Sequence, residues 1–336
     1  MATSFKPDFY ITVGASAGGL NAVTELVSSL PTNLKAAVFV VLHLSKIGVG
    51  DFLIHRLQKY TNYTCVIGAE GMEIEGNTIY LAPPDKHLLI KDDHIVLGLG
   101  PAENRWRPSV DVLFRSAAVA KTNKVIGIVL TGYLNDGTSG MDAIKRSGGV
   151  CIVQDPHEAE YPDMPLSVIE HMEVDHCISL KEMGSTIEQI IEHSRSVQIE
   201  APEDVKVESM IAERVVTSVS TVEQIGETTN FVCPDCGGGL WRMPHDAVER
   251  FRCHIGHSYT MNDFILKQGE KLEATLWVAL RMMEERKNVL EKVKEREDKK
   301  GLKRVASTYN DRIDELEKHV DILKHVLFNT QKRIAV

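Results

Sequence analysis

Short runs of hydrophobic residues alternate with amphipathic stretches over roughly the first 190 residues. The runs are rich in valine and isoleucine, which is typical of parallel strands buried on both faces. They predict strands at residues 9–14, 36–43, 125–132 and 150–155, and the stretches between them predict helices at 18–30, 51–60 and 139–148. Strands that alternate with helices in this way predict an α/β fold with a doubly wound, mostly parallel sheet.

Residues 71–98 have a different pattern, in which strand-like runs follow each other closely around turn residues. The connections are too short to hold a helical crossover. This segment therefore predicts an antiparallel hairpin, inserted into the domain or placed at the edge of its sheet.

The character of the chain changes after residue 195. Residues 196–228 are rich in acidic residues, Ser, Thr and Val and contain no aromatic residue, which is typical of a linker without a packed core. A compact cysteine and histidine module follows at 229–259, and residues 260–336 are helical in pattern. We therefore expect an α/β domain at 1–195, a linker, a small metal-binding module and a helical tail.

The tail carries hydrophobic residues at heptad spacing in two segments, separated by the polar residues 298–301. This spacing predicts a helical hairpin or a coiled coil. The positions are Leu272, Leu276, Ala279, Met283, Leu290 and Val293 in the first segment, and Tyr309, Ile313, Leu316, Val320, Leu323 and Leu327 in the second.

Composition narrows the classes of function. Of the 336 residues 43% are hydrophobic, and the formal net charge is −9, which argues against binding to nucleic acid. The sequence has no run of 18 consecutive apolar residues, so it predicts no membrane span. Its first residues do not resemble a signal peptide. Three of the six cysteines cluster late in the chain, a pattern that suits a metal site in a reducing cytoplasm better than a disulfide framework.

Ser16 stands in the sequence Gly14-Ala-Ser-Ala-Gly18, between a predicted strand and a predicted helix. This is the G-x-S-x-G pattern, in which small residues permit a sharp turn that exposes a nucleophilic serine. A glycine-rich turn that binds phosphate is the alternative. A dinucleotide site would require a glycine in place of Ser16 and an acid after the second strand, where this chain has His43.

Two partners for Ser16 follow the ends of other strands. His43 ends the second predicted strand, and Asp136 follows the strand at 125–132. Because the carboxyl ends of parallel strands meet at one edge of a sheet, we expect the three side chains to form a Ser-His-Asp triad. Their order along the chain differs from that of α/β-hydrolases, so the triad belongs to another fold.

These motifs together resemble the catalytic domain of CheB-type protein-glutamate methylesterases. Beside GASAGG and His43, the resemblance rests on segments 80–90, 107–114, 127–141 and 153–165. It implies that Ser16, His43 and Asp136 remove methyl groups from glutamyl methyl esters of chemoreceptors, and some members also deamidate receptor glutamine. The implied partner is a methylated chemoreceptor or a similar signalling protein.

The chain departs from this family at two positions near the predicted site. Ala17 replaces the usual threonine after the nucleophile, and Tyr133 replaces a common methionine. The backbone N–H groups of both residues are the candidates to stabilise the oxyanion. The resembling enzymes also carry an N-terminal receiver domain, whereas this sequence starts directly at the catalytic domain. The competing hypotheses are a non-catalytic scaffold that docks receptor helices and, more remotely, a nucleotide- or nucleic-acid-binding protein.

Cys233, Cys236, Cys253 and His257 form a C-x2-C…C-x3-H pattern. Four such ligands predict a closed, structural zinc site, with His254 as the rival fourth ligand. We expect removal of the metal to unfold this module and to leave ester hydrolysis intact. The module and the heptad helices are candidates for docking, the helices also for a homodimer.

Overall fold

The computed structural model describes residues 5–32, 34–43, 50–194, 199–214 and 218–334. The chain divides into two compact units, Met1–Met261 and Asn262–Val336. No helix within the described ranges is both long and apolar enough to cross a membrane.

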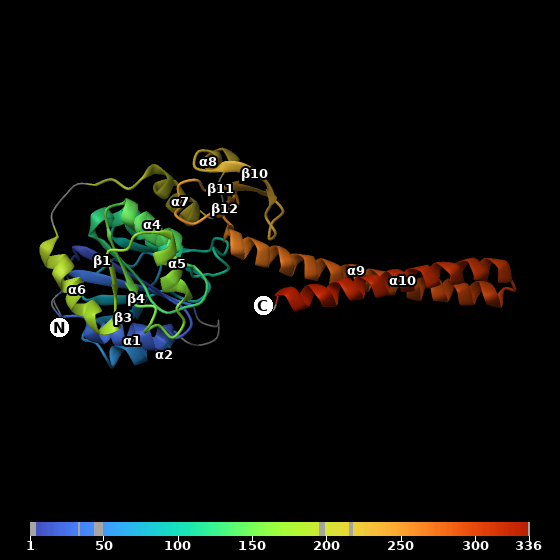
Figure 1. Ribbon diagram of the computed structural model, residues 1–336, viewed down its shortest axis with the longest axis horizontal. Helices are drawn as coiled ribbons and strands as arrows, with labels where there is room; N and C mark the ends of the chain where they lie inside the picture. The colour runs from blue at the N-terminus through green and yellow to red at the C-terminus, as the bar shows by residue number, and fades with distance from the viewer. Residues whose placement is uncertain (1–4, 33, 44–49, 195–198, 215–217, 335–336) are drawn as a thin grey trace. The chain divides into compact units, whose positions relative to one another are not determined.

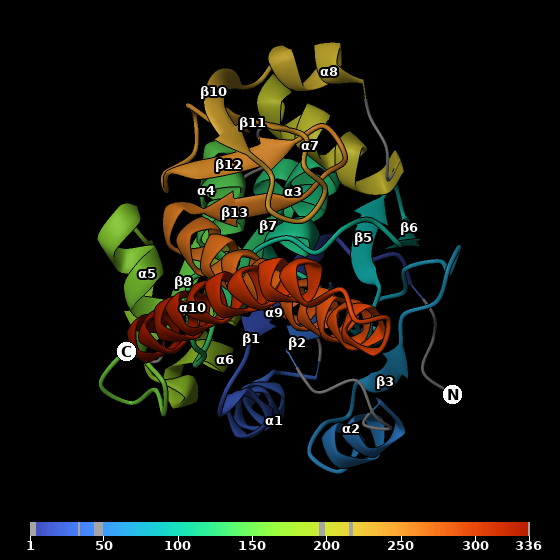
Figure 2. The ribbon, with the colours of Figure 1, turned by 90° about the vertical axis from the view of Figure 1, so that its right-hand side faces the viewer.

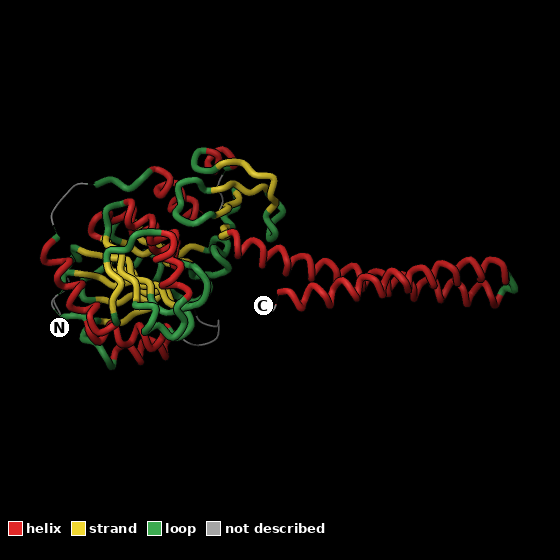
Figure 3. The backbone as a smooth tube through the Cα atoms, viewed as in Figure 1, coloured by secondary structure: helices red, strands yellow, loops and turns green. Residues whose placement is uncertain are grey.

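A seven-stranded sheet lies at the centre of the first unit, with helices on both faces (Figures 1 and 3). All its neighbouring strands are parallel, in the order β3-β4-β2-β1-β7-β8-β9. The strands are β1 (Phe9–Ala15), β2 (Ala36–Leu42), β3 (Thr64–Ile67), β4 (Thr78–Leu81), β7 (Val125–Val129), β8 (Val150–Gln154) and β9 (His176–Ile178). The prediction of a doubly wound α/β fold is confirmed.

Each face of the sheet carries its own hydrophobic core. One core joins the sheet to α1 (Gly19–Ser29), α2 (Gly50–Gln58) and α6 (Leu180–His193). The other joins it to α3 (Val110–Lys121), which the short helix η1 (Thr122–Lys124) follows, and to α4 (Thr138–Arg146) and α5 (Asp163–His171). The central strands β1 and β2 are buried along their whole length, which explains their unbroken apolar sequence.

The segment predicted as a hairpin divides between two sheets. Strands β5 (His87–Lys91) and β6 (His94–Gly98) form the expected antiparallel pair. Strand β4, within the same segment, instead joins the main sheet in parallel between β2 and β3. The hairpin prediction was therefore right for residues 87–98 and wrong for residues 78–81.

The predicted linker at 196–228 contains two helices, α7 (Glu203–Arg214) and α8 (Val219–Glu223). Val205 of α7 is buried in the core that also holds α3, and Val207 and Ile211 pack with Trp241 of the cysteine module. The prediction of a linker without a packed core is therefore wrong for these helices. Hydrophobic residues spaced along α7 bury one of its faces, although the segment is strongly acidic.

The cysteine module is a four-stranded antiparallel sheet, which we call the ribbon (Figure 2). Its strands are β10 (Glu227–Val232), β11 (Gly239–Arg242), β12 (Arg250–Cys253) and β13 (Ser258–Thr260). It belongs to the same compact unit as the α/β domain.

The second unit is a helical hairpin of α9 (Met261–Lys299) and α10 (Lys303–Ile334). A seam of hydrophobic residues joins the helices, including Leu280, Val320 and Leu327. Gly301, with φ of 77°, lies in the turn between them. The heptad pattern predicted this hairpin correctly.

Candidate active site

The three residues of the predicted triad lie at the carboxyl ends of neighbouring strands. Ser16 directly follows β1, and His43 directly follows β2, which pairs with β1 so that Ala15 lies opposite Leu42. Asp136 lies in the loop between β7, the other neighbour of β1, and α4. The strand order changes direction at β1 and β7, which is where open α/β sheets place their sites.

Hydrogen bonds between backbone groups of the turn that carries Ser16 and Thr131 hold this turn in place. The Ser16 N–H donates to the carbonyl of Thr131 at 3.0 Å, and the Thr131 hydroxyl donates to the carbonyl of Ala17 at 3.1 Å. Gly18 has φ of 72°, a backbone conformation that residues other than glycine rarely adopt. Helix α1 begins one residue later. Ser16 therefore stands at the N-terminus of a helix, where N–H groups and the helix dipole favour negative charge.

His43 and Asp136 are joined directly. The His43 Nε2 lies 2.9 Å from Asp136 Oδ2, and both side chains are buried. The His43 Nδ1 is also buried and has no hydrogen-bond partner among the described residues, Ser16 included. Since Asp136 occupies Nε2, the atom left to receive a proton is Nδ1, the reverse of the arrangement in chymotrypsin. The predicted hydrogen bond between Ser16 and His43 is therefore not present in this structure.

The Asp136 carboxylate is surrounded by donors. Besides His43 it accepts hydrogen bonds from the backbone N–H groups of Val110 at 2.8 Å and Asp111 at 3.2 Å. The Ser109 hydroxyl and the Asn104 amide donate to it at 2.8 and 3.1 Å. Burial would raise the pKa of Asp136, but the contact with His43 and these donors outweigh burial and lower it. Asp136 is therefore held in its charged form beside His43.

A second buried carboxyl, Asp111, lies beside the triad. It accepts hydrogen bonds from the backbone N–H groups of Gly137 and Gly140, at 3.0 and 2.6 Å, and from the Asn104 amide at 2.6 Å. Burial, and then the charge of Asp136, raise the pKa of Asp111 to about 7. The two environments thus move the pKa values of the two carboxyls apart, so that the negative charge stays on Asp136, the partner of His43.

Two residues of the site were missed in the sequence. The indole of Trp106 stacks on the His43 ring, with centroids 4.2 Å apart and planes 6° apart. Asn104 joins Asp111 and Asp136 through one amide group. Both precede the segment 107–114 that supported the family resemblance, and no strand or helix periodicity marks them.

The two predicted oxyanion donors differ in their surroundings. Within the described part of the chain, the Ala17 N–H has no hydrogen-bond acceptor, so it is free to bind a ligand oxygen. The Tyr133 side chain is 52% exposed and packs against Tyr161, with ring centroids 4.5 Å apart. Tyr133 thus offers an aromatic surface beside the site.

Gly132 provides a test of how tightly the Ser16 turn is packed. A Cβ at position 132 would lie 2.7 Å from the Ser16 Cβ and 2.1 Å from the Met164 Sδ. We expect Gly132→Ala to displace Ser16 and to reduce kcat about 100-fold, since small displacements of catalytic groups have such effects. Gly100→Ala is the matched control, because its Cβ would meet only the Ala212 carbonyl at 3.7 Å. Equal kcat values for the two variants on a small ester would contradict this packing.

The four predicted metal ligands converge. Each of the four residues offers one ligand atom, and these atoms all lie within 4.8 Å of one another; the residues are Cys233, Cys236, Cys253 and His257. The Sγ atoms of Cys236 and Cys253 are 3.8 Å apart, and Cys253 Sγ is 3.5 Å from His257 Nδ1. A tetrahedral zinc site requires separations of about 3.8 Å between two sulfurs and about 3.6 Å between sulfur and nitrogen. His254, the rival ligand, lies outside this cluster and its ring packs edge-on to Trp241.

Six charged groups meet where the ribbon packs against α3 and α7, and all are buried except Asp246, which is partly buried. Glu103 pairs with Arg115 of α3 and with Arg252 of β12, and Glu208 of α7 pairs with Arg250 at 2.6 Å. Asp246 also binds Arg250, at 2.6 Å. Three arginines thus face three acids, so the cluster is balanced in charge.

This cluster predicts a loss of stability in acid. Burial would raise the pKa of Glu208, but the three arginines outweigh burial and lower it to about 2, and they lower the pKa of Glu103 as well. A carboxyl whose folded pKa lies below its unfolded value stabilises the fold above the unfolded value, about 4.3, and this stabilisation is lost as the pH falls further.

We therefore expect the melting temperature to fall steeply from about pH 4 to pH 2. Glu208→Gln should be less stable at neutral pH but should show a shallower fall in this range. Glu227→Gln, which removes a surface ion pair with Arg242, is the control and should follow the wild type. If the melting temperatures of Glu208→Gln and the wild type fall equally from pH 4 to pH 2, the buried carboxylate of Glu208 does not cause the acid instability.

Comparison with known proteins identifies the family of the α/β domain. The family model described as CheB methylesterase matches residues 11–187. A relative from Leptospira interrogans, named putative protein-glutamate methylesterase/protein-glutamine glutaminase, is 39% identical over 175 residues, which are 52% of this chain and 90% of the relative. A relative from Methanosarcina mazei, named protein-glutamate methylesterase/protein-glutamine glutaminase 2, is 34% identical over 189 residues, and the match covers 54% of this chain and 51% of that protein.

A solved structure extends the comparison to the fold. The crystal structure of the Thermotoga maritima CheB methylesterase catalytic domain has 30% sequence identity and a TM-score of 0.52, and the match covers 55% of this chain and 98% of that one. The family match spans more than half of the chain and includes all three triad residues. The chain therefore belongs to the CheB methylesterase family.

Proposed function

We propose that this protein is a serine hydrolase that removes methyl groups from glutamyl methyl esters of a chemoreceptor-like protein. The observation that carries the proposal is the buried contact of 2.9 Å between His43 and Asp136 beside the helix N-terminus at Ser16. The names of the relatives supply the substrate class, and they include glutaminase activity. Deamidation of a receptor glutamine by the same site is therefore part of the proposal.

In the proposed mechanism His43 is the general base. Its Nδ1 takes the proton of the Ser16 hydroxyl while Ser16 Oγ attacks the ester carbonyl carbon. The negative charge on the carbonyl oxygen is stabilised by the Ala17 N–H and by the helix dipole. His43 then gives the proton to the methoxy oxygen, and methanol leaves an acyl group on Ser16.

Water completes the cycle. His43 removes one proton from a water molecule, whose oxygen attacks the acyl carbon, and this proton passes to Ser16 Oγ as the glutamic acid side chain leaves. The carboxylic acid then loses its proton to the solvent and becomes the glutamate carboxylate. Asp136 remains charged throughout and stabilises the protonated His43 ring. With a glutamine side chain, ammonia would leave in place of methanol.

The test is methanol release from a chemoreceptor fragment methylated at its glutamates. We expect the wild-type protein to release methanol and the Ser16→Ala variant to bind the fragment without turnover. Binding without methanol release by the wild type would instead support the non-catalytic scaffold. Ammonia release from a receptor with glutamine at the same positions tests the deamidase activity.

We also propose that the four clustered ligands Cys233, Cys236, Cys253 and His257 hold a structural Zn²⁺. Three thiolates and an imidazole suit zinc, and a site with four protein ligands leaves no position for substrate. One zinc per chain by elemental analysis, lost in the Cys236→Ser variant, is the expected result. A cytoplasmic location agrees with reduced thiols at this site.

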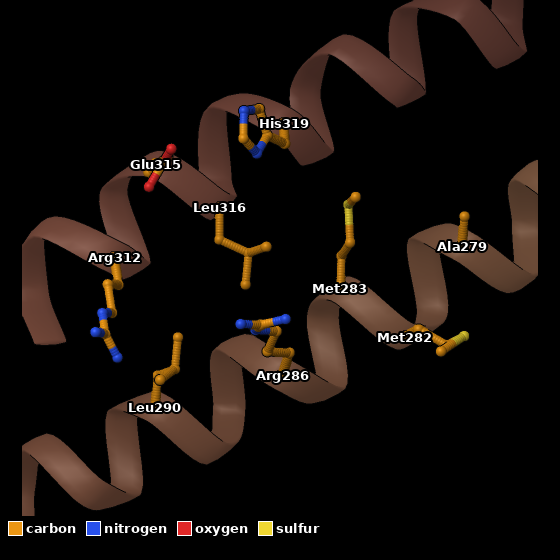
Figure 4. A pocket seen from close by; sticks show the side chains of 9 residues that line it. All are labelled: Ala279, Met282, Met283, Arg286, Leu290, Arg312, Glu315, Leu316 and His319. Atoms are coloured by element: carbon orange, nitrogen blue, oxygen red, sulfur yellow. The ribbon is translucent and has the colours of Figure 1, made fainter.

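The partner of the helical hairpin is proposed to be a second copy of this chain. Met282, Val289 and Ile322 are each about 60% exposed although they are apolar. A groove of about 590 Å³ lies between the helices (Figure 4). Leu290, Leu316 and Met283 line it together with Ala279, Met282, Arg286, Arg312, Glu315 and His319. Two hairpins that cover these surfaces would form a four-helix bundle.

Sedimentation of the full chain tests this pairing. We expect a dimer for the wild type and a monomer for the double variant Met282→Lys, Val289→Lys. Lys292→Gln, an exposed substitution on the same helix, should remain a dimer. A monomeric wild type that binds a receptor fragment through this hairpin would assign the surface to the receptor instead.

A further inference from the structure

A four-residue loop, Glu103–Trp106, carries the two side chains that the sequence did not identify. Its ends are closed by backbone hydrogen bonds between Glu103 and Trp106, at 3.2 and 2.9 Å. Asn104 and Arg105 have φ of 48° and 72°. Asparagine tolerates this left-handed region, whereas an arginine is unfavourable there unless its surroundings hold it.

The ribbon supplies part of that support. The Asn104 N–H donates to the carbonyl of Ser258 in β13 at 3.0 Å. Arg252 of β12 donates to the Glu103 carboxylate at 2.6 Å, and both side chains are buried. The Asn135 amide, next to Asp136, donates to the Thr260 hydroxyl at 3.0 Å.

These supporting residues are adjacent to the metal ligands. Arg252 precedes Cys253, the last residue of β12, and Ser258 follows His257. The Cys253 N–H also donates to the His257 carbonyl at 3.0 Å, which closes the turn between β12 and β13. One metal ion held by ligands on both sides of this turn would tie the end of β12 to the start of β13. A bound metal would thus fix the two strands that hold the loop.

The loop in turn contacts two members of the triad. Trp106 stacks on His43, and Asn104 donates to Asp136. We propose that the metal-folded ribbon is a positioning element of the active site, which holds Trp106 and Asn104 against His43 and Asp136. The inference rests on the proposed triad and metal site. It replaces our sequence-based expectation that hydrolysis is independent of the metal.

The experiment starts from the full chain with its metal bound. A chelator removes the metal, and one equivalent of Zn²⁺ then restores it. A Trp241→Phe, Trp277→Phe background leaves Trp106 as the sole tryptophan of the three in the sequence. Two assays are made: steady-state kinetics on a small glutamyl methyl ester, which give kcat and KM, and quenching of Trp106 emission by acrylamide. Quenching reports whether the indole remains stacked, and it does not depend on activity.

Removal of the metal should lower kcat about 100-fold with less change in KM, because misplaced catalytic groups affect the transition state more than binding. Quenching of Trp106 should increase several-fold, and Zn²⁺ should restore both values. An unchanged kcat together with unchanged quenching in metal-free protein would overturn the proposal.

A pair of arginine variants separates positioning from simple loss of folding. Arg252→Gln removes the bond to Glu103 yet leaves all four metal ligands, whereas Arg242→Gln alters an exposed arginine of the same ribbon. At equal zinc content, Arg252→Gln should lower kcat about 10-fold and raise quenching, and Arg242→Gln should do neither. Equal behaviour of the two variants would overturn the proposal. If the loaded wild type hydrolyses no ester, the proposed function fails, and quenching of Trp106 still decides whether the ribbon positions the loop.

Discussion

Replacement of Ser16 by alanine should reduce kcat for ester hydrolysis by at least about 10⁴-fold, because deletion of a triad nucleophile has effects of this size or larger. KM should change far less, since the hydroxyl contributes little to binding of the ester. The effect follows from the position of Ser16 at the end of β1, because the other residues of its turn, Ala15, Ala17 and Gly18, carry no hydroxyl, and the Thr131 hydroxyl nearby donates to the Ala17 carbonyl.

Steady-state kinetics on a small glutamyl methyl ester give the measurement. Ser28→Ala, in the helix that Ser16 precedes, is the control, because the exposed Ser28 hydroxyl donates to the Glu25 carbonyl of its own helix. The double variant Ser16→Ala, His43→Ala should be hardly worse than Ser16→Ala alone, since the residues act as a unit. Residual activity above about one hundredth in Ser16→Ala would show that another nucleophile is used.

Replacement of Asp136 by asparagine should reduce kcat about 10⁴-fold, as in a serine protease triad. Both carboxylate oxygens of Asp136 accept hydrogen bonds from N–H or O–H groups. An amide has only one acceptor oxygen, so its NH₂ group must face donors in either orientation. With that group toward His43, the proton moves to Nδ1, and His43 can no longer accept the proton of Ser16.

The same variant should lose stability, because buried donors at Ser109 and Val110 lose a charged acceptor. Asp51→Asn, an exposed acid in the first turn of α2, is the control for both measurements. Activity of Asp136→Asn within tenfold of the wild type would mean that the ring of His43 does not depend on Asp136 for its tautomer.

The sequence predicted those parts of the site that follow directly from the sheet. Strands of valine and isoleucine are recognisable because they are buried on both faces, and their ends locate Ser16, His43 and Asp136. The spacing of the metal ligands was equally informative, since zinc requires few residue types in a fixed arrangement. The heptads predicted the hairpin because its hydrophobic seam is continuous.

The remainder depends on contacts between distant segments. Trp106 and Asn104 lie in a loop whose conformation is held by residues about 150 positions later, such as Arg252 at a separation of 149 residues from Glu103. Buried arginines cannot be recognised in a sequence, because arginine is usually exposed unless acids from other elements surround it. Helix α7 was not predicted for the same reason, since its acidic Glu208 is buried against Arg250.

The most direct test of the account is covalent labelling of the full chain by a fluorophosphonate, with the adduct located by peptide mass spectrometry. We expect one adduct, on Ser16, that forms rapidly in the wild type, is absent in Ser16→Ala and forms far more slowly in His43→Gln. Absence of an adduct in active protein, or an adduct on Ser16 that forms equally fast without His43, would contradict it.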